Sequence, residues 1–220
     1  MSQLHSIKTK VIIKRGILQM MFPHTKLRYI NEQMGFGVFA TKFIPKGTIT
    51  WALDDLDHIL EPEFVAKLDK PRRKFLNKYS FRNQNGQYIL CWDLGRYLNH
   101  SFHANCIGTA YNFEIAIRDI LPGEQLTNDY GTLNIGTSFK PISEEGTERK
   151  RVNPDDLLYF YKEWDQQVTE ALKHFNDVEQ PLIHLIRPEF KEKVMIAAKE
   201  HVLPDSIKNN YYNRSSKKQK

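Results

Sequence analysis

Residues 96–106 read RYLNHSFHANC, and residues 124–131 read EQLTNDYG. The first stretch follows soon after an apolar run at residues 88–92, and the second ends a run with the texture of a short strand. Asn and His side chains beside core-forming strands must be hydrogen-bonded there or bind something, because a buried polar group without a partner costs free energy. One predicted hairpin separates the two polar segments. We therefore predict that they meet in one composite site.

The composition is that of an ordinary globular protein. The 220 residues are long enough for one domain with an appendage and a real core, with 40% hydrophobic and 26% charged residues. The net charge is +6, but the dense basic cluster lies at the end of the chain, in residues 214–220. Such a charge run is usually a solvated tail. The sequence therefore does not favour a nucleic-acid partner, except for weak contacts through this tail.

Cysteine usage and hydropathy limit the class of protein further. Cys91 and Cys106 have no paired spacing, so neither a disulfide framework nor a metal site is expected, and the usage suits a reducing compartment. No apolar run approaches the roughly 18 residues of a membrane span, so no membrane association is expected.

The texture changes twice along the chain. Short strands broken by Gly and Pro turns fill the first part, with a helical insert predicted between about residues 61 and 79. From Asn153, a plausible N-cap, apolar residues recur every three or four positions and predict an amphipathic helix. The sequence thus divides into a basic lead-in at 1–21, a β-rich domain at 22–133, a loop at 134–152, a helical extension at 153–204 and a disordered basic tail at 205–220.

Residues 35–40 read GFGVFA, which matches the glycine pattern of dinucleotide-binding folds. That pattern must follow an apolar strand and open a helix. Here the preceding residues are mixed in polarity, and the following ones contain Pro45 and Gly47. We therefore predict a hairpin turn rather than a dinucleotide site.

Four segments taken in order resemble the SET-domain protein-lysine methyltransferases. They are GFGVFA with IPKGT at residues 35–48, RYLNHS with the later NC at 96–106, EIAIRDI at 114–120 and LTNDYG at 126–131. The resemblance covers about residues 27–133. It implies a β-rich α+β fold of the SET β-clip type, with a short helical insert and a helical C-terminal extension. It also implies a pseudoknot, in which the segment carrying Tyr130 threads under a loop from the Asn99 region.

The resemblance implies S-adenosylmethionine as the methyl donor and the lysine of a protein substrate as the acceptor. Tyr130 would be the catalytic residue, whose hydroxyl orients the lysine nitrogen. The donor-binding residues would be Gly35, Phe36, Gly37, Asn99 and His100. The walls of the lysine channel would be formed by Tyr88, Phe102 and Asn128.

The chain departs from the family pattern at two positions that matter. No cysteine follows Cys106, so the Cys-rich zinc module that completes the donor pocket in many relatives is absent. Phe160, Tyr161 or Trp164 on the predicted helix is our candidate to cover the adenine in its place, with Trp164 first, although apolar residues at helical spacing usually form a core stripe. Asn128 stands where relatives often carry an aromatic residue that tunes how many methyl groups fit.

Two other functions remain open at this stage. The chain could be a non-catalytic SET-like module that binds a protein, or it could methylate a small-molecule amine. The target, the number of methyl groups and the oligomeric state are not fixed by the sequence. A compact chain of this kind suits the cytoplasm of a bacterium, or the nucleus if the chain is eukaryotic.

Overall fold

The computed structural model describes residues 21–214. The predicted basic lead-in, apart from Met21, and the last six residues of the predicted tail lie outside the described residues. Within residues 21–214, no helix has both the length and the apolar character needed to cross a membrane.

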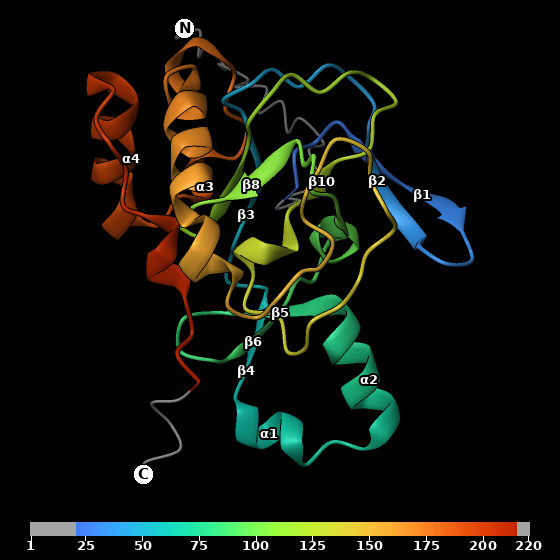
Figure 1. The fold of residues 1–220 in the computed structure, drawn as a ribbon. Helices are drawn as coiled ribbons and strands as arrows, with labels where there is room; N and C mark the ends of the chain where they lie inside the picture. The colour runs from blue at the N-terminus through green and yellow to red at the C-terminus, as the bar shows by residue number, and fades with distance from the viewer. Residues whose placement is uncertain (1–20, 215–220) are drawn as a thin grey trace, which may run out of the picture.

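The glycine motif lies in a β-hairpin, as predicted. β1 (Thr25–Asn31) pairs with β2 (Gly35–Ala40) in an antiparallel two-stranded sheet, at the right of Figure 1. Gly35, at the start of β2, has a φ of +80°, a left-handed conformation that favours glycine. The motif therefore turns the chain back on itself and opens no helix.

The central sheet has five strands in the order β3-β9-β8-β10-β7. Their bounds are β3 Ile49–Ala52, β7 Asn99–His100, β8 Cys106–Gly108, β9 Phe113–Ala116 and β10 Thr127–Asn128. β10 runs parallel to both β7 and β8 and lies between them, although β7 and β8 follow each other in the chain. This insertion is the crossing expected of the pseudoknot, and the whole is the predicted β-rich α+β fold.

A third sheet carries the helical insert. β4 (His58–Leu60), β5 (Ser80–Arg82) and β6 (Tyr88–Leu90) pair in the order β4-β6-β5. Between β4 and β5 the chain forms α1 (Pro62–Ala66) and α2 (Lys70–Tyr79), which lie at the bottom of Figure 1. Asp69 caps α2, where its carboxylate accepts a hydrogen bond of 3.0 Å from the Arg72 N–H.

The C-terminal helices cover one face of the central sheet. α3 (Asp156–Leu172) and α4 (Pro188–Glu200) share a buried core with Phe113 and Ile115 of β9. α3 begins at Asp156, so the predicted N-cap at Asn153 is wrong. The Asp156 carboxylate accepts a 3.0 Å hydrogen bond from the Asn153 N–H instead. Short 3-10 helices complete the path: η1 Leu94–Tyr97, η2 Tyr130–Thr132, η3 Phe175–Asp177, η4 Ile183–Leu185 and η5 Ile207–Asn210.

Residues 205–214 are ordered, which corrects the prediction of a disordered tail from residue 205. The Ile207 side chain is buried in the core that α3 and α4 share, and its N–H donates to an Asp165 carboxylate oxygen at 2.8 Å. The Tyr212 N–H donates to the Asn134 side chain at 2.9 Å. The sequence pattern of a basic tail did not indicate that Ile207 would pack into the core. This packing holds the segment in place.

Candidate active site

The strand crossing brings the two polar segments of the sequence together. The Ser101 N–H donates to the Asn128 carbonyl at 3.2 Å, beside the parallel pairing of β7 and β10. The buried Asn105 side chain joins the same crossing: it donates to the Gln125 carbonyl and accepts from the Thr127 N–H, each at 2.8 Å. The predicted composite site therefore exists, and backbone pairing holds it together.

His100 is a neutral imidazole at the centre of this crossing. Burial, and then the nearby Arg149 guanidinium, lower the pKa of His100 to about 4. Its Nδ1 accepts a hydrogen bond of 3.1 Å from the Tyr130 N–H, so the proton of the neutral ring is on Nε2. The Nε2 atom is buried and has no hydrogen-bond partner among the described residues. The 3.8 Å approach of Nδ1 to the Asp129 carboxylate is therefore not an ion pair.

Tyr130 follows directly after the crossing and keeps its phenolic proton. The hydroxyl donates a 2.5 Å hydrogen bond to the Leu98 carbonyl. Burial, and then the charge of Glu114, raise the pKa of Tyr130 well above its ordinary value. A hydroxyl whose hydrogen is held by a carbonyl can still accept a hydrogen bond from an N–H group. Tyr130 can therefore orient an amine but cannot serve as its base near neutral pH.

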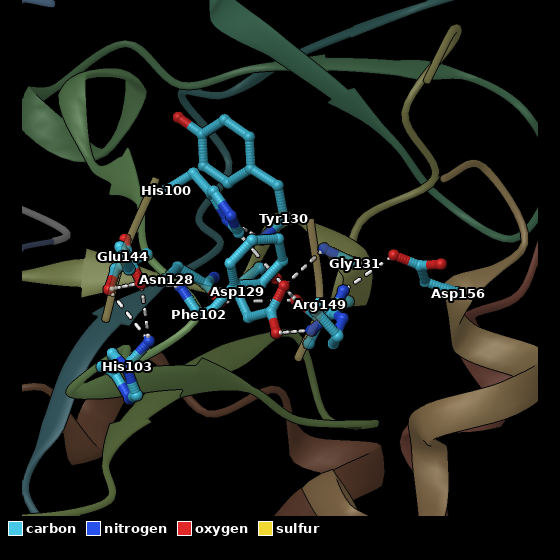
Figure 2. Close-up of polar contacts among 12 residues, drawn as sticks. His100, Phe102, His103, Asn128, Asp129, Tyr130, Gly131, Glu144, Arg149 and Asp156 are labelled. Atoms are coloured by element: carbon cyan, nitrogen blue, oxygen red, sulfur yellow. Dashed lines mark hydrogen bonds and ion pairs between the residues drawn. The ribbon is translucent and has the colours of Figure 1, made fainter. Parts of the chain in front are cut away.

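Arg149 links the Tyr130 segment to α3 (Figure 2). Its guanidinium pairs with the Asp129 carboxylate on one side and with the Asp156 carboxylate, at 2.7 Å, on the other. The rings of Phe102 and Phe160 lie 4.6 Å and 4.4 Å from the guanidinium carbon. One buried cation thus neutralises two buried carboxylates and fixes the position of the segment that follows β10.

The segment at residues 134–152 folds back over the Asn-His motif. A Glu144 carboxylate oxygen accepts from the Phe102 N–H at 2.8 Å and from the Ser101 hydroxyl at 3.2 Å. Figure 2 shows Glu144 close to Phe102 and His103. The Phe139 ring lies 5.8 Å from the His100 ring and 6.2 Å from the Tyr130 ring. This segment, which was predicted only as a loop, therefore completes the site beside His100 and Tyr130.

A cavity of about 780 Å³ opens beside the Tyr130 ring. Tyr88 and Tyr130 both line it, and the Tyr88 hydroxyl accepts a hydrogen bond from Arg82. Phe102 and Asn128 do not belong to this wall within the described part of the chain. Phe102 packs against Arg149 because the loop after β7 turns it away, and Asn128 is buried behind Glu114, to which its amide donates at 2.5 Å. Of the three predicted channel residues, only Tyr88 lies in the cavity wall.

The glycine motif touches the Asn-His motif directly. The Asn99 side-chain amide donates a 2.9 Å hydrogen bond to the Phe36 carbonyl. A Cβ atom added to Gly37 would lie 2.6 Å from the Gln125 side-chain nitrogen and 3.0 Å from that of Asn99, so a larger residue would have to push these side chains aside. The structure therefore brings Gly35, Phe36, Gly37, Asn99 and His100 together at one end of the crossing.

Trp164 does not have the position that its predicted role requires. Its side chain is 3% exposed and belongs to the core that α3 shares with the central sheet. It lies so close to Gly131 that a Cβ atom added there would be 2.9 Å from the indole ring. The proposal that Trp164 covers an adenine is therefore wrong, because the ring has no open face. Its periodic position on α3 indicated packing, and packing is what it does.

Three residues of the candidate site were not predicted from the sequence. Arg149 and Glu144 lie in a mixed-charge segment without periodicity, and no local pattern marks them. Glu114 could have been predicted from the sequence, because it is a charged residue among the apolar residues of β9. In the structure it is buried. A charged residue in the middle of an apolar strand is rarely buried without a role, so it indicates a candidate site residue.

Comparison with known proteins agrees with this geometry. The family model described as SET domain matches residues 35–131. The chain is also 30% identical over 128 residues to a protein of Schizosaccharomyces pombe named histone-lysine N-methyltransferase, H3 lysine-36 specific. That similarity covers 51% of this chain and 15% of the length of the yeast protein. The chain therefore contains a SET domain, at residues 35–131.

Proposed function

We propose that this chain is an S-adenosylmethionine-dependent methyltransferase that methylates the side-chain amine of a lysine in a protein substrate. The observation that carries the proposal is the position of Tyr130. Tyr130 lines the cavity while its N–H is bonded to His100, inside the crossing that carries Asn99. Tyr130 thus connects the cavity proposed for the lysine amine with the residues proposed to bind the methyl donor.

The residues at the glycine motif fit S-adenosylmethionine. The backbone at Gly35 is open, since a Cβ atom there would meet nothing within 4 Å, and a ligand can approach it closely. Two buried donors nearby, His100 Nε2 and Gln125 Nε2, have no partner among the described residues. The carboxylate, the ribose hydroxyls and the adenine nitrogens of the donor are acceptors of the kind that these groups require.

When bound, S-adenosylmethionine supplies an electrophilic methyl group on a sulfonium sulfur. The protein then has to align a neutral amine with that methyl group and exclude water. Tyr130 orients the amine through its hydroxyl oxygen, and Tyr88 walls the approach. A lysine amine in water has a pKa near 10.4, so a dry cavity must lower it before the nitrogen can react.

A lysine in a protein is the acceptor that the comparisons support best. The yeast relative is named for methylation of a histone lysine, although this chain spans 15% of its length. The cavity opens beside the helical insert, since Asn77, Lys78 and Tyr79 of α2 contribute to its wall. A chain segment lying along α2 could therefore insert one long side chain toward Tyr130.

Calorimetry with S-adenosylmethionine tests the donor half of the proposal. We expect saturable binding by the wild-type protein and binding weaker by about tenfold or more in Asn99→Ala, since the lost amide contact is of hydrogen-bond magnitude. Asn176→Ala, an exposed asparagine in η3, serves as the matched control and should bind normally. No binding by the wild-type protein would contradict the proposal. Binding without methyl transfer to any protein would favour a non-catalytic module or a small-molecule amine.

A further inference from the structure

One buried acid beside Tyr130 has no role in the chemistry described so far. Glu114 lies on β9, is 8% exposed, and lines the same cavity as Tyr88 and Tyr130. One carboxyl oxygen, Oε1, accepts the 2.5 Å hydrogen bond from the Asn128 amide. The other, Oε2, is buried without a partner among the described residues. Burying a carboxyl group with half of its capacity unused costs free energy, which points to a ligand.

A second unpartnered group lies next to this carboxyl. Trp51 of β3 is the register partner of Glu114 in the antiparallel pair, so the two side chains project from the same face of the sheet. Trp51 also lines the cavity, and its Nε1 is buried without a partner among the described residues. Two residues of the cavity wall therefore carry a buried polar atom without a partner among the described residues, an acceptor on Glu114 and a donor on Trp51, in a lining of mixed polarity. This is how a site for a small polar group is built.

Among the described residues, no cationic side chain pairs with Glu114. The titratable groups that its charge affects are Cys106 of β8, Cys91 after β6 and Tyr130 of η2, and none of them is a base. The side chains next to Glu114 are the uncharged Asn128 of β10 and Trp51 of β3. Helix α3 packs on the other face of β9. Two arginines of the cavity wall are engaged elsewhere: Arg82 donates to Tyr88, and Arg96 to the Cys91 and Trp92 carbonyls. A buried acid in such a setting lacks a positive partner.

Burial raises the pKa of Glu114 to about 7, against a smaller opposite effect of the Asn128 hydrogen bond. A carboxyl group with such a pKa exchanges its proton readily near neutral pH. The Tyr130 phenol cannot do so, because its pKa is raised far above neutrality. Among the residues that line the cavity next to Tyr130, Glu114 is the one suited to take up a proton.

We propose that Glu114 is the base that receives the substrate ammonium in the cavity and removes one proton from it. This inference rests on the proposed function, because the substrate is the lysine amine. One N–H bond of the ammonium breaks, the proton bonds to the Glu114 carboxylate, and the electron pair stays on the nitrogen as its lone pair. Glu114 later gives the proton to water in the open cavity. Without the donor the ammonium and the carboxylate form an ion pair, and beside the positive charge of a bound donor the ammonium gives up its proton more easily, because like charges repel.

The role of Asn128 follows from the same contact. The Asn128 amide donates to the Oε1 atom of Glu114 and so fixes the position of the carboxyl group. We therefore assign Asn128 as a positioning residue that acts through Glu114. Its substitution should shift the pH profile of the reaction and leave donor binding unchanged.

The first experiment measures the charge state of Glu114 without any reaction. Protein labelled with carbon-13 in the glutamate carboxyl groups is titrated by NMR, and the Glu114 resonance is assigned by its loss in Glu114→Gln. We expect its pKa to fall by at least one unit when n-butylamine is added, because the butylammonium ion mimics the lysine side chain and favours the carboxylate. Neutral n-butanol should have no effect. An unchanged Glu114 titration in the presence of n-butylamine would overturn the proposal.

The second experiment compares methyl transfer to a protein lysate at two pH values. Glu114→Gln should lose about 10²-fold or more of the rate at pH 7 and recover most of it at pH 10, where the amine loses its proton in solution. It should bind S-adenosylmethionine like the wild type, as should the exposed control Glu163→Gln, which keeps its rate. A Glu114→Gln rate at pH 7 equal to the wild-type rate would refute the assignment. Absence of transfer by the wild type would count against the proposed function instead, while the NMR titration still decides the site.

Discussion

The Arg149→Ala variant would leave two buried carboxylates, those of Asp129 and Asp156, without the guanidinium that pairs with both. The side chains of these residues are 17%, 5% and 2% exposed, so water cannot take over the pairing. Breaking a buried pair by removal of one partner costs about 3–5 kcal/mol. In a protein of this size about 1 kcal/mol lowers the melting temperature by about 2–4 °C, so we expect a fall of roughly 6–20 °C.

Urea unfolding followed by tryptophan fluorescence measures this loss, since Trp164 lies 5.6 Å from the guanidinium carbon. Arg151→Ala, an exposed neighbour, is the matched control and should change the free energy of unfolding by less than about 0.5 kcal/mol. The double variant Arg149→Ala with Asp156→Asn should regain part of the loss, because one unpaired charge is removed. A loss below about 1 kcal/mol in Arg149→Ala would refute the view that this arginine holds the Tyr130 segment on α3.

Three further variants test single contacts by the free energy of unfolding in urea. Because the folded-state pKa of Glu114 is raised from 4.5 to about 7, its stability contribution is full below pH 4.5 and is lost as pH rises through 7. Glu114→Gln should therefore be more stable than the wild type at pH 8, by up to about 3 kcal/mol, and an unchanged value would contradict the burial argument. The pKa of His100 is lowered from 6.5 to about 4, so stability is present above pH 6.5 and is lost as pH falls toward 4, and His100→Gln should remove that part of the pH dependence. Glu144→Ala should cost about 1–3 kcal/mol through its lost hydrogen bonds at the Asn-His motif, whereas the exposed Glu145→Ala should be neutral, and equal effects would argue against a specific role.

The motifs of the sequence were enough to predict the centre of the fold. Asn99 and Tyr130 belong to two polar segments that were predicted to meet in one site. The crossing of β10 between β7 and β8 brings these segments together. The hairpin at Gly35 could also be predicted locally, because a glycine flanked by polar residues favours a turn. In the structure Gly35 has the positive φ that such a turn requires. The crossing itself was implied by the resemblance to the SET family, whereas the hairpin depends on local backbone geometry, which local sequence encodes well.

The surroundings of the site depend on long-range contacts, which no local sequence pattern predicts. Arg149 pairs with Asp129 across a separation of twenty residues, and Glu144 reaches back to the Phe102 N–H from a segment without periodicity. Trp164 was misassigned because an aromatic on a periodic helix can face a ligand or the core, and only packing against Gly131 decides between them. Ile207 was missed because one apolar residue in a basic segment carries no periodic signal.

The most direct test of the central claim is transfer of a labelled methyl group from S-adenosylmethionine to a protein lysate, followed by hydrolysis and identification of the labelled amino acid. We predict labelled methyl-lysine with the wild-type protein. Tyr130→Phe, which lacks only the hydroxyl, should bind the donor normally and transfer label about 10²-fold more slowly or worse, a loss of the size seen when one preorganised polar contact at a reacting centre is removed. Absence of methyl-lysine with the wild type, or undiminished label with Tyr130→Phe, would contradict the account.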